Sequence, residues 1–254
     1  MAIFVCDIFL SKGEYVKKFN ILYIILPILI ALVIALASIL GVYIMRDKNK
    51  KSDYWQMKYD SFKVQNANLS KGQIVFVGDS ITDFYPLDDY YADLNLATYN
   101  RGIGGDTTGG LLDRMKVSIF DLEPSKIVLM IGVNDIVGGR KNNEYVLNNY
   151  DRILKQISQN LPSAEVHCMS LLPICMDIQP YVPNYDIAAL NNQILQANTS
   201  IEELASNYGY NYHNLNQLVS NEGDSLKSQY TDDGLHLNSA GFEIWTNLLK
   251  PFLV

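Results

Sequence analysis

A short apolar run that ends in glycine and serine places the strongest constraint on the fold of this chain. Residues 74–77 are Ile, Val, Phe and Val, a pattern that is typical of a buried strand. Gly78 follows, and it permits a tight turn because glycine has no Cβ to clash with the backbone. Such a turn would hold Ser80 at the carboxyl edge of a sheet, where ligands bind in open α/β folds. The run therefore predicts an α/β fold with a candidate nucleophile at that edge.

Apolar runs and helical periodicities alternate along the rest of the chain. Further strands are predicted over residues 94–99, 126–131, 165–171 and 211–215. Helices are predicted over residues 111–119, 142–160, 184–208 and 239–249. This alternation predicts a five-stranded parallel sheet with right-handed crossovers and helices on both faces.

An uncharged run precedes the predicted sheet. Residues 21–45 contain 25 residues without a charged side chain, and about 20 apolar residues suffice to cross the hydrocarbon core of a bilayer. The run predicts one transmembrane helix that acts as an uncleaved anchor. A cleaved signal peptide is the alternative, although its apolar region is usually shorter, about 7–15 residues. The predicted organisation is a tail over 1–20, this helix, a juxtamembrane linker with the start of a first helix over 46–70, and a folded domain over 71–254.

The charges beside the uncharged run barely discriminate between the two orientations in a membrane. Basic residues occur on both sides of it, as Lys12, Lys17 and Lys18 before it and Arg46, Lys48, Lys50 and Lys51 after it. The positive-inside rule counts the two sides nearly equally. We expect a single-pass membrane protein with its folded domain outside the cell, because a lone N-terminal anchor most often serves export.

The folded part of the chain is acidic. Residues 52–254 hold 13 lysines and arginines against 24 aspartates and glutamates, a net charge of −11. Such a surface suits neither nucleic acid nor an anionic membrane face. We therefore expect no nucleic-acid partner, and the charge leaves the chemistry of the substrate open.

Three cysteines, Cys6, Cys168 and Cys175, are too few for a disulfide framework. Cys168 and Cys175 could pair if the domain were extracellular. The favoured interpretation is that they are two small core residues.

A serine nucleophile needs a base, and the chain has three histidines. His167 and His213 fall inside predicted strands, where a core or edge position is expected. His236 instead lies in a polar turn before the last helix, with Asp233 three residues earlier. A carboxylate on the far ring nitrogen would fix the tautomer of the imidazole and stabilise its protonated form. The spacing alone is equally compatible with an N-capping turn.

An acyl-transfer enzyme would also need donors for an oxyanion. Gly105 lies in a glycine-rich loop after the second predicted strand, and Asn134 follows the third. With the N–H group of Ser80, these groups would meet at one edge of the sheet. A phosphate cradle is an alternative role for the glycine-rich loop, but the loop lacks the lysine of such motifs. No cluster of cysteine and histidine has the spacing of a zinc site, so no metal is expected.

Four short blocks together resemble the SGNH hydrolases, also called GDSL esterases and lipases. The blocks are residues 78–80, 102–106, 132–135 and 233–236, and their order and spacing match that family over about residues 72–252. The chain most resembles the lysophospholipase-L1-like and platelet-activating-factor-acetylhydrolase-like branch, although Ile81 replaces the leucine common after the serine. The resemblance implies a flavodoxin-like three-layer α/β/α sandwich, ester hydrolysis without a cofactor, and an oxyanion role for Gly105.

The predicted function is that of a membrane-anchored serine esterase. Ser80 would attack the ester, His236 would take its proton, Asp233 would orient His236, and the N–H groups of Ser80 and Gly105 with the amide of Asn134 would bind the oxyanion. The substrate would be a small-molecule, glycan or lipid ester, of the short acyl, acetyl or lysophospholipid type. An O-acyltransferase acting on cell-envelope glycans and a non-catalytic binding module are the alternatives.

Two loops are expected to border the substrate pocket, over residues 82–93 and 174–186. Their tyrosines are candidates for its walls or for solvent-exposed loop positions, namely Tyr85, Tyr90, Tyr91, Tyr181 and Tyr185.

Overall fold

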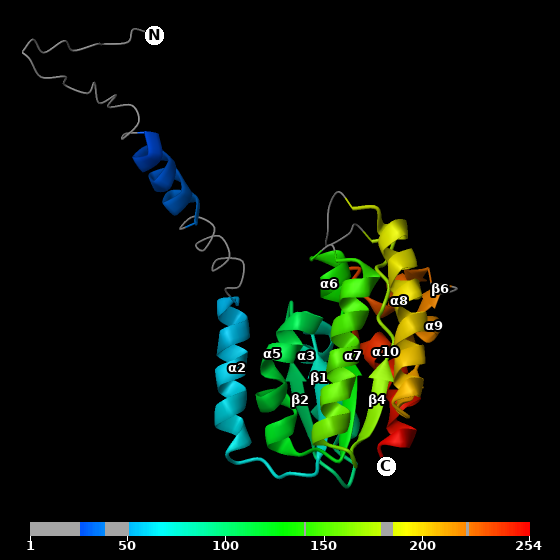
Figure 1. The fold of residues 1–254 in the computed structure, drawn as a ribbon. Helices are drawn as coiled ribbons and strands as arrows, with labels where there is room; N and C mark the ends of the chain where they lie inside the picture. The colour runs from blue at the N-terminus through cyan, green and yellow to red at the C-terminus, as the bar shows by residue number, and fades with distance from the viewer. Residues whose placement is uncertain (1–25, 39–50, 140, 179–184, 222–223) are drawn as a thin grey trace, which may run out of the picture. The chain divides into compact units, whose positions relative to one another are not determined.

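The computed structural model describes residues 26–38, 51–139, 141–178, 185–221 and 224–254. The chain divides into two compact units, Met1–Lys51 and Ser52–Val254. The second unit contains the sheet and most of the helices (Figure 1).

The prediction of a transmembrane helix over residues 21–45 is wrong. Within the described parts of the chain, no helix is both long and apolar enough to span a bilayer. The described helical residues of the first unit, 26–38, span roughly 20 Å at 1.5 Å per residue, whereas the hydrocarbon core is about 30 Å thick. The rest of the predicted segment and the predicted tail lie outside the described residues. The expectations that depend on this helix are therefore wrong as well. They are a single-pass membrane localisation, membrane contact through residues 21–45 and a folded domain outside the cell.

A five-stranded parallel sheet forms the centre of the second unit, as predicted, in the order β2-β1-β3-β4-β5. This is the strand order of flavodoxin-like folds. The strands are β1 (Ile74–Gly78), β2 (Thr98–Gly102), β3 (Lys126–Met130), β4 (Glu165–Met169) and β5 (Asn211–His213). The inner strand β1 pairs with β2 and β3 in a register that sets Gly78 opposite both Gly102 and Met130. The carboxyl ends of these three strands are therefore level with one another.

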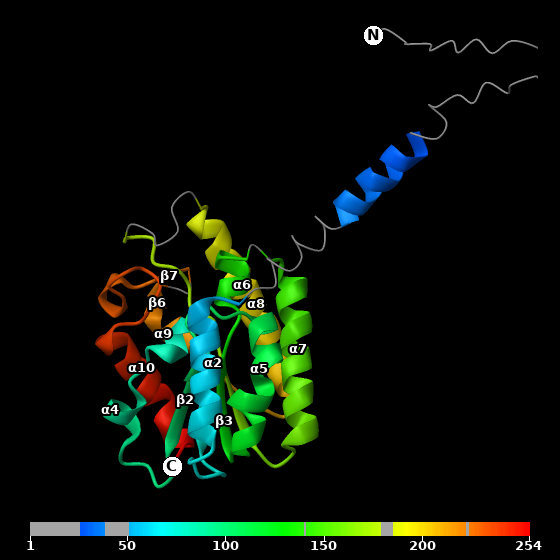
Figure 2. The same cartoon turned by 90° about the vertical axis from the view of Figure 1, so that its left-hand side faces the viewer.

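Helices cover both faces of this sheet (Figures 1 and 2). On one face, α2 (Asp53–Asn66) packs against α5 (Thr108–Ser118), α5 against α7 (Asn143–Asn160), and α7 against α8 (Ile187–Asn207). The other face carries α4 (Leu87–Tyr91) and α10 (Ser239–Leu249). These layers agree with the predicted α/β/α sandwich.

Short elements occupy the connections between strands and helices. They are α3 (Ser80–Asp83), α6 (Val133–Val137), α9 (Leu215–Val219), the 3₁₀ turns Phe120–Leu122, Ser228–Tyr230 and Lys250–Phe252, and an antiparallel pair of β6 (Ser220–Asn221) and β7 (Ser225–Leu226). Two of them, α3 and α6, directly follow the carboxyl ends of β1 and β3. They therefore carry the residues that leave the sheet at its ligand-binding edge.

The second strand begins four residues later than its predicted start. Residues 94–97 lie in the turn after α4, where the N–H of Leu94 donates to the carbonyl of Tyr91. The strand itself is the polar segment Thr98–Gly102, which is only half-buried over its first three residues. An edge strand has a neighbour on one side alone, so it lacks the apolar run by which central strands are recognised.

Two of the candidate pocket tyrosines belong to the core. Tyr85 and Tyr91 are each 2% exposed, and their hydroxyl oxygens lie 2.9 Å apart. The ring of Tyr85 stacks on Phe242 of α10, with ring centroids 4.6 Å apart. These contacts fix α4 and α10 against each other, so neither tyrosine is a pocket wall. Tyr181 lies outside the described residues.

The histidines of β4 and β5 and the two cysteines of this unit are buried, as expected. Cys168 and Cys175 are both free and buried, which confirms them as core residues. His167 Nδ1 and His213 Nε2 lie 2.9 Å apart. Burial, followed by the neighbouring imidazole of His213, lowers the pKa of His167 to about 4, and burial also lowers the pKa of His213.

This histidine pair predicts a pH-dependent contribution to stability. Both histidines are neutral in the folded protein, whereas an unfolded histidine titrates near 6.5. The contribution of the neutral pair to the free energy of unfolding is therefore complete above pH 6.5, and it is lost as the pH falls towards 4. We expect the stability advantage of the wild type over His167→Gln to shrink by about 2 kcal/mol between pH 7.5 and pH 4.5.

Urea denaturation followed by circular dichroism at several pH values measures this advantage. The buried carboxyl of Asp79, whose pKa is raised to about 7, titrates in both proteins and cancels in the difference. An advantage that stays constant over this pH range would contradict the prediction.

Candidate active site

Ser80 lies just beyond the carboxyl end of strand β1, where the sequence predicts it. A Cβ on Gly78 would lie 2.2 Å from the carbonyl oxygen of Met130 and 2.3 Å from the hydroxyl oxygen of Thr82, so only glycine fits there. The next residue, Asp79, accepts a hydrogen bond from the N–H of Ile81 at 3.1 Å and caps α3. The turn therefore presents Ser80, with 7% of its surface exposed, as the first residue of α3.

The structure brings Ser80, His236 and Asp233 together in one hydrogen-bonded chain. His236 Nε2 lies 2.8 Å from Ser80 Oγ, and His236 Nδ1 lies 2.6 Å from Asp233 Oδ2. These distances match the arrangement of a nucleophile, a base and an orienting carboxylate. Asp232, next to Asp233 in the sequence, instead accepts a hydrogen bond from Asn238.

Asp233 also organises the turn that carries His236. Its Oδ1 accepts the N–H groups of Leu235 and His236, at 2.9 and 2.8 Å. The Asp-x-x-His spacing therefore serves both as a capping turn and as a carboxylate–imidazole pair, since one carboxylate oxygen caps the turn and the other binds the imidazole. Partial burial raises the pKa of Asp233, but the hydrogen bonds from the ring and the backbone of His236 outweigh burial and hold that pKa below its usual range.

The two other candidate oxyanion donors lie on neighbouring segments. Gly105 has a φ of +75°, and no atom lies within 4 Å of the position that a Cβ would take there. Its backbone is thus open to the approach of another molecule. Asn134 belongs to α6, and its Nδ2 donates to the carbonyl oxygen of Asp106 at 2.9 Å. Since a carboxamide nitrogen carries two hydrogens, this contact orients the amide and uses one of them.

A buried ion pair joins the glycine-rich loop to the turn that carries the serine. Arg114 Nε donates to Asp106 Oδ2 at 2.7 Å, and both side chains are almost fully buried. The same guanidinium donates to the carbonyl oxygen of Gly78 at 2.8 Å. Sequence reasoning missed this pair, because nothing in a single sequence marks which arginine is buried. The only available signal is that Arg114 falls on the helix directly after the glycine-rich loop.

The comparison with known families agrees with this geometry. The profile of the GDSL-like lipase/acylhydrolase family matches residues 76–244, which include all the candidate site residues. The chain belongs to this family. It is a hydrolase that acts on ester bonds. The membership of the SGNH or GDSL family that the four sequence blocks predict is confirmed.

Solved structures of similar proteins have the same fold. A proposed platelet activating factor from Streptococcus pneumonia is 27% identical, with a TM-score of 0.71 over 87% of this chain and 99% of that one. A GDSL-like lipase from Bacteroides thetaiotaomicron is 26% identical, with a TM-score of 0.67 over 77% of this chain and 96% of that one. An acetyl xylan esterase, 19% identical with a TM-score of 0.58 over 72% of this chain and 100% of that one, shares the fold. No protein with a curated description matches the sequence.

An exposed aromatic ring beside the histidine is a further feature of this GDSL-like hydrolase. Phe84 is 54% exposed, and its ring centroid lies 5.0 Å from that of His236. Sequence reasoning did not single it out, because a lone phenylalanine after a short helix is normally a core residue. An exposed ring at this position offers an apolar surface to a substrate bound at Ser80.

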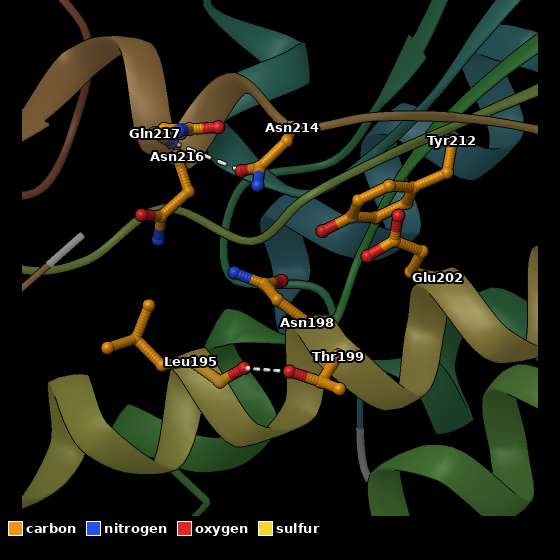
Figure 3. Close-up of a pocket in the computed structure, with 8 residues that line it drawn as sticks. All are labelled: Leu195, Asn198, Thr199, Glu202, Tyr212, Asn214, Asn216 and Gln217. Atoms are coloured by element: carbon orange, nitrogen blue, oxygen red, sulfur yellow. Dashed lines mark hydrogen bonds between the residues drawn. The ribbon is translucent and has the colours of Figure 1, made fainter. Parts of the chain in front are cut away.

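A separate cavity of about 290 Å³ lies between α8 and the end of β5 (Figure 3). It is lined mostly by polar side chains, from Leu195, Asn198, Thr199, Glu202, Tyr212, Asn214, Asn216 and Gln217. No serine, cysteine or histidine is among them, so this cavity lacks a nucleophile paired with a base. Among the described residues, no group of three or more histidine, cysteine, aspartate or glutamate side chains could hold a metal ion.

The Arg114–Asp106 pair leads to a prediction about stability. Arg114→Met should destabilise the protein by about 3–5 kcal/mol, because it leaves the buried carboxylate of Asp106 without its charged partner. Lys116→Met is the matched control, since Lys116 lies on the same helix and its side chain is 79% exposed. We expect that control to change the stability by less than about 0.5 kcal/mol.

Chemical denaturation at pH 7.5 measures both variants. Equal losses of unfolding free energy in the two variants, or an Arg114→Met variant as stable as the wild type, would contradict the prediction that the buried pair stabilises the protein.

Proposed function

We propose that the chain is a serine esterase in which Ser80 is the nucleophile, His236 the general base and Asp233 the residue that orients it. The observation that carries this proposal is the unbroken chain of contacts from Ser80 Oγ to His236 and on to Asp233, at 2.8 and 2.6 Å. In such an arrangement the base removes the serine proton as the serine attacks. The depressed pKa of Asp233 keeps its carboxylate ionised and able to stabilise the imidazolium that forms.

Acylation begins when Ser80 Oγ adds to the ester carbonyl carbon and His236 Nε2 takes the serine proton. The carbonyl oxygen becomes an oxyanion, for which the N–H groups of Ser80 and Gly105 and the amide of Asn134 are the proposed donors. The C–O bond to the alcohol then breaks, and His236 gives its proton to the leaving oxygen. Water attacks the acyl-serine with His236 as base, which releases the carboxylic acid and restores Ser80.

The proposed substrates are small-molecule or glycan esters with a short acyl group, such as an acetyl ester, and lysophospholipid-type esters. The exposed ring of Phe84 beside His236 supports an apolar group at the reacting ester. The 27% identical structure described as a proposed platelet activating factor supports the lipid ester within this range.

Replacement of the nucleophile tests the proposal. The full chain should hydrolyse p-nitrophenyl acetate, and Ser80→Ala should lower kcat by at least about 10³ because the covalent step is lost. Ser220→Ala is the control, since Ser220 is also buried but its hydroxyl donates to the carbonyl oxygen of Asn216 instead of contacting the triad. Turnover by Ser80→Ala at the wild-type rate would overturn the assignment. Labelling of Ser80 by a fluorophosphonate probe separates the enzyme from a binding module, and acyl transfer to an added glycan in place of hydrolysis would indicate an acyltransferase.

Replacement of the amide tests the oxyanion site. Asn134→Ala should lower kcat by about 10²–10³ while KM changes little, because the oxyanion exists only in the transition state and the intermediate. Steady-state kinetics with p-nitrophenyl acetate measures both constants. A rise in KM at unchanged kcat would instead assign Asn134 to substrate binding.

A further inference from the structure

Helix α2 lies outside the segment that matches the family, since it ends at Asn66 and the match begins at residue 76. The helix begins after Ser52, whose hydroxyl oxygen accepts the N–H of Trp55. It packs against α5 (Figure 2), and its end contacts Arg101 of β2. Three side chains from its first two turns reach the segments that carry the candidate active site.

The first contact is made by Trp55. Its indole Nε1 donates to Asp106 Oδ1 at 3.0 Å, and the residue is only 8% exposed. Arg114 occupies the other carboxylate oxygen of Asp106, and Asn134 Nδ2 binds its carbonyl oxygen. Trp55 is thus one of three side chains that together determine the position of Asp106.

The second and third contacts are made by Tyr54 and Lys58, which both reach Asp83. The hydroxyl of Tyr54 donates to Asp83 Oδ2 at 2.6 Å, and Lys58 Nζ lies 2.7 Å from Asp83 Oδ1. Asp83 Oδ2 also accepts the N–H of Gly104 at 2.9 Å. Asp83 is the last residue of α3, the short helix that begins at Ser80. The helix α2 therefore holds the serine-bearing segment and the glycine-rich loop in one hydrogen-bonded unit.

These contacts bracket the proposed oxyanion donor. Gly104 is held through Asp83 and Asp106 is held by Trp55, and Gly105 lies between them. A glycine at a φ of +75° has no side chain of its own to fix it. The direction of its N–H then depends on its two neighbours in the chain.

We infer that α2 is a positioning element of the catalytic machinery, with Trp55 as its main residue and Tyr54 and Lys58 as supporting ones. The inference rests on the proposed function. Trp55 acts through Asp106 on Gly105 and Asn134. Loss of its hydrogen bond would let both donors shift, and a shift of about 1 Å at a catalytic group can cost up to 10² in rate.

The side of α2 that faces the protein also has an ordinary packing role, which the test has to separate from positioning. Trp55 and Phe62 form a small buried cluster with Ile103 and Val117. Truncation of Trp55 to alanine would disrupt this cluster. Trp55→Phe keeps an aromatic ring there, which can still stack on Tyr59 as the indole does, and removes the N–H donor.

The experiment measures kcat and KM of the full chain with p-nitrophenyl acetate. Trp55→Phe should lower kcat about tenfold and leave KM within twofold, since the affected donors act on the oxyanion. The matched control is Tyr59→Phe on the same helix, which removes a hydroxyl with no described hydrogen bond and should keep the wild-type kcat. Thermal unfolding of each variant checks that the protein remains folded at the assay temperature.

A double variant, Trp55→Phe with Asn134→Ala, decides whether Trp55 acts through the oxyanion site. If it does, the combined loss in kcat should be smaller than the product of the two single losses, because residues that act as a unit are non-additive and only the part that acts through Gly105 remains. A folded Trp55→Phe with wild-type kcat, or a loss that multiplies fully with that of Asn134→Ala, would overturn the inference. Ser80→Ala in the same assay separates this outcome from failure of the proposed function, which would appear as retained activity in Ser80→Ala.

Discussion

The buried guanidinium of Arg114 is the contact on which the geometry of the active site depends. It donates to the carboxylate of Asp106 and to the carbonyl oxygens of Gly78 and Arg101, so all of its bonds lie inside the protein. A buried charge costs several kcal/mol unless it is paired and hydrogen-bonded, and here Arg114 has a charged partner and each of its three side-chain nitrogens donates a hydrogen bond. The turn before Ser80 and the loop around Gly105 are consequently tied to the same group and cannot move independently.

Close approach of backbones makes this shared anchor possible. A Cβ on Gly102 would lie 2.2 Å from the backbone nitrogen of Asp83, just as a Cβ on Gly78 would collide with β3. Glycine at these strand ends lets α3 and the glycine-rich loop lie against each other at the edge of the sheet. The histidine reaches the same edge from the far end of the chain, on a turn that Asp233 closes with one oxygen while the other binds the imidazole.

Much of this arrangement could be predicted, and the errors have physical causes. Central strands and amphipathic helices have local patterns, so β1, β3 and α10 were predicted within one residue. The edge strand β2 is polar, so its start is predicted four residues too early. Tyr85 and Tyr91 are candidates from sequence for pocket walls or exposed loop positions, whereas both are buried in the core. An apolar run near the N-terminus predicted a membrane span that the described part of the chain does not contain.

The sequence by itself determined the alternation of strands and helices, the family, and the identity of Ser80, Asp233, His236, Gly105 and Asn134 as candidates, because each lies in a block whose local pattern is readable. Only the tertiary structure decided that Trp55, Asp83, Arg114 and Phe84 belong to the same site. Their partners lie between 8 and 152 residues away in the chain. Burial and long-range hydrogen bonding, which no local pattern encodes, are the reason that these four residues became visible only after the chain was folded.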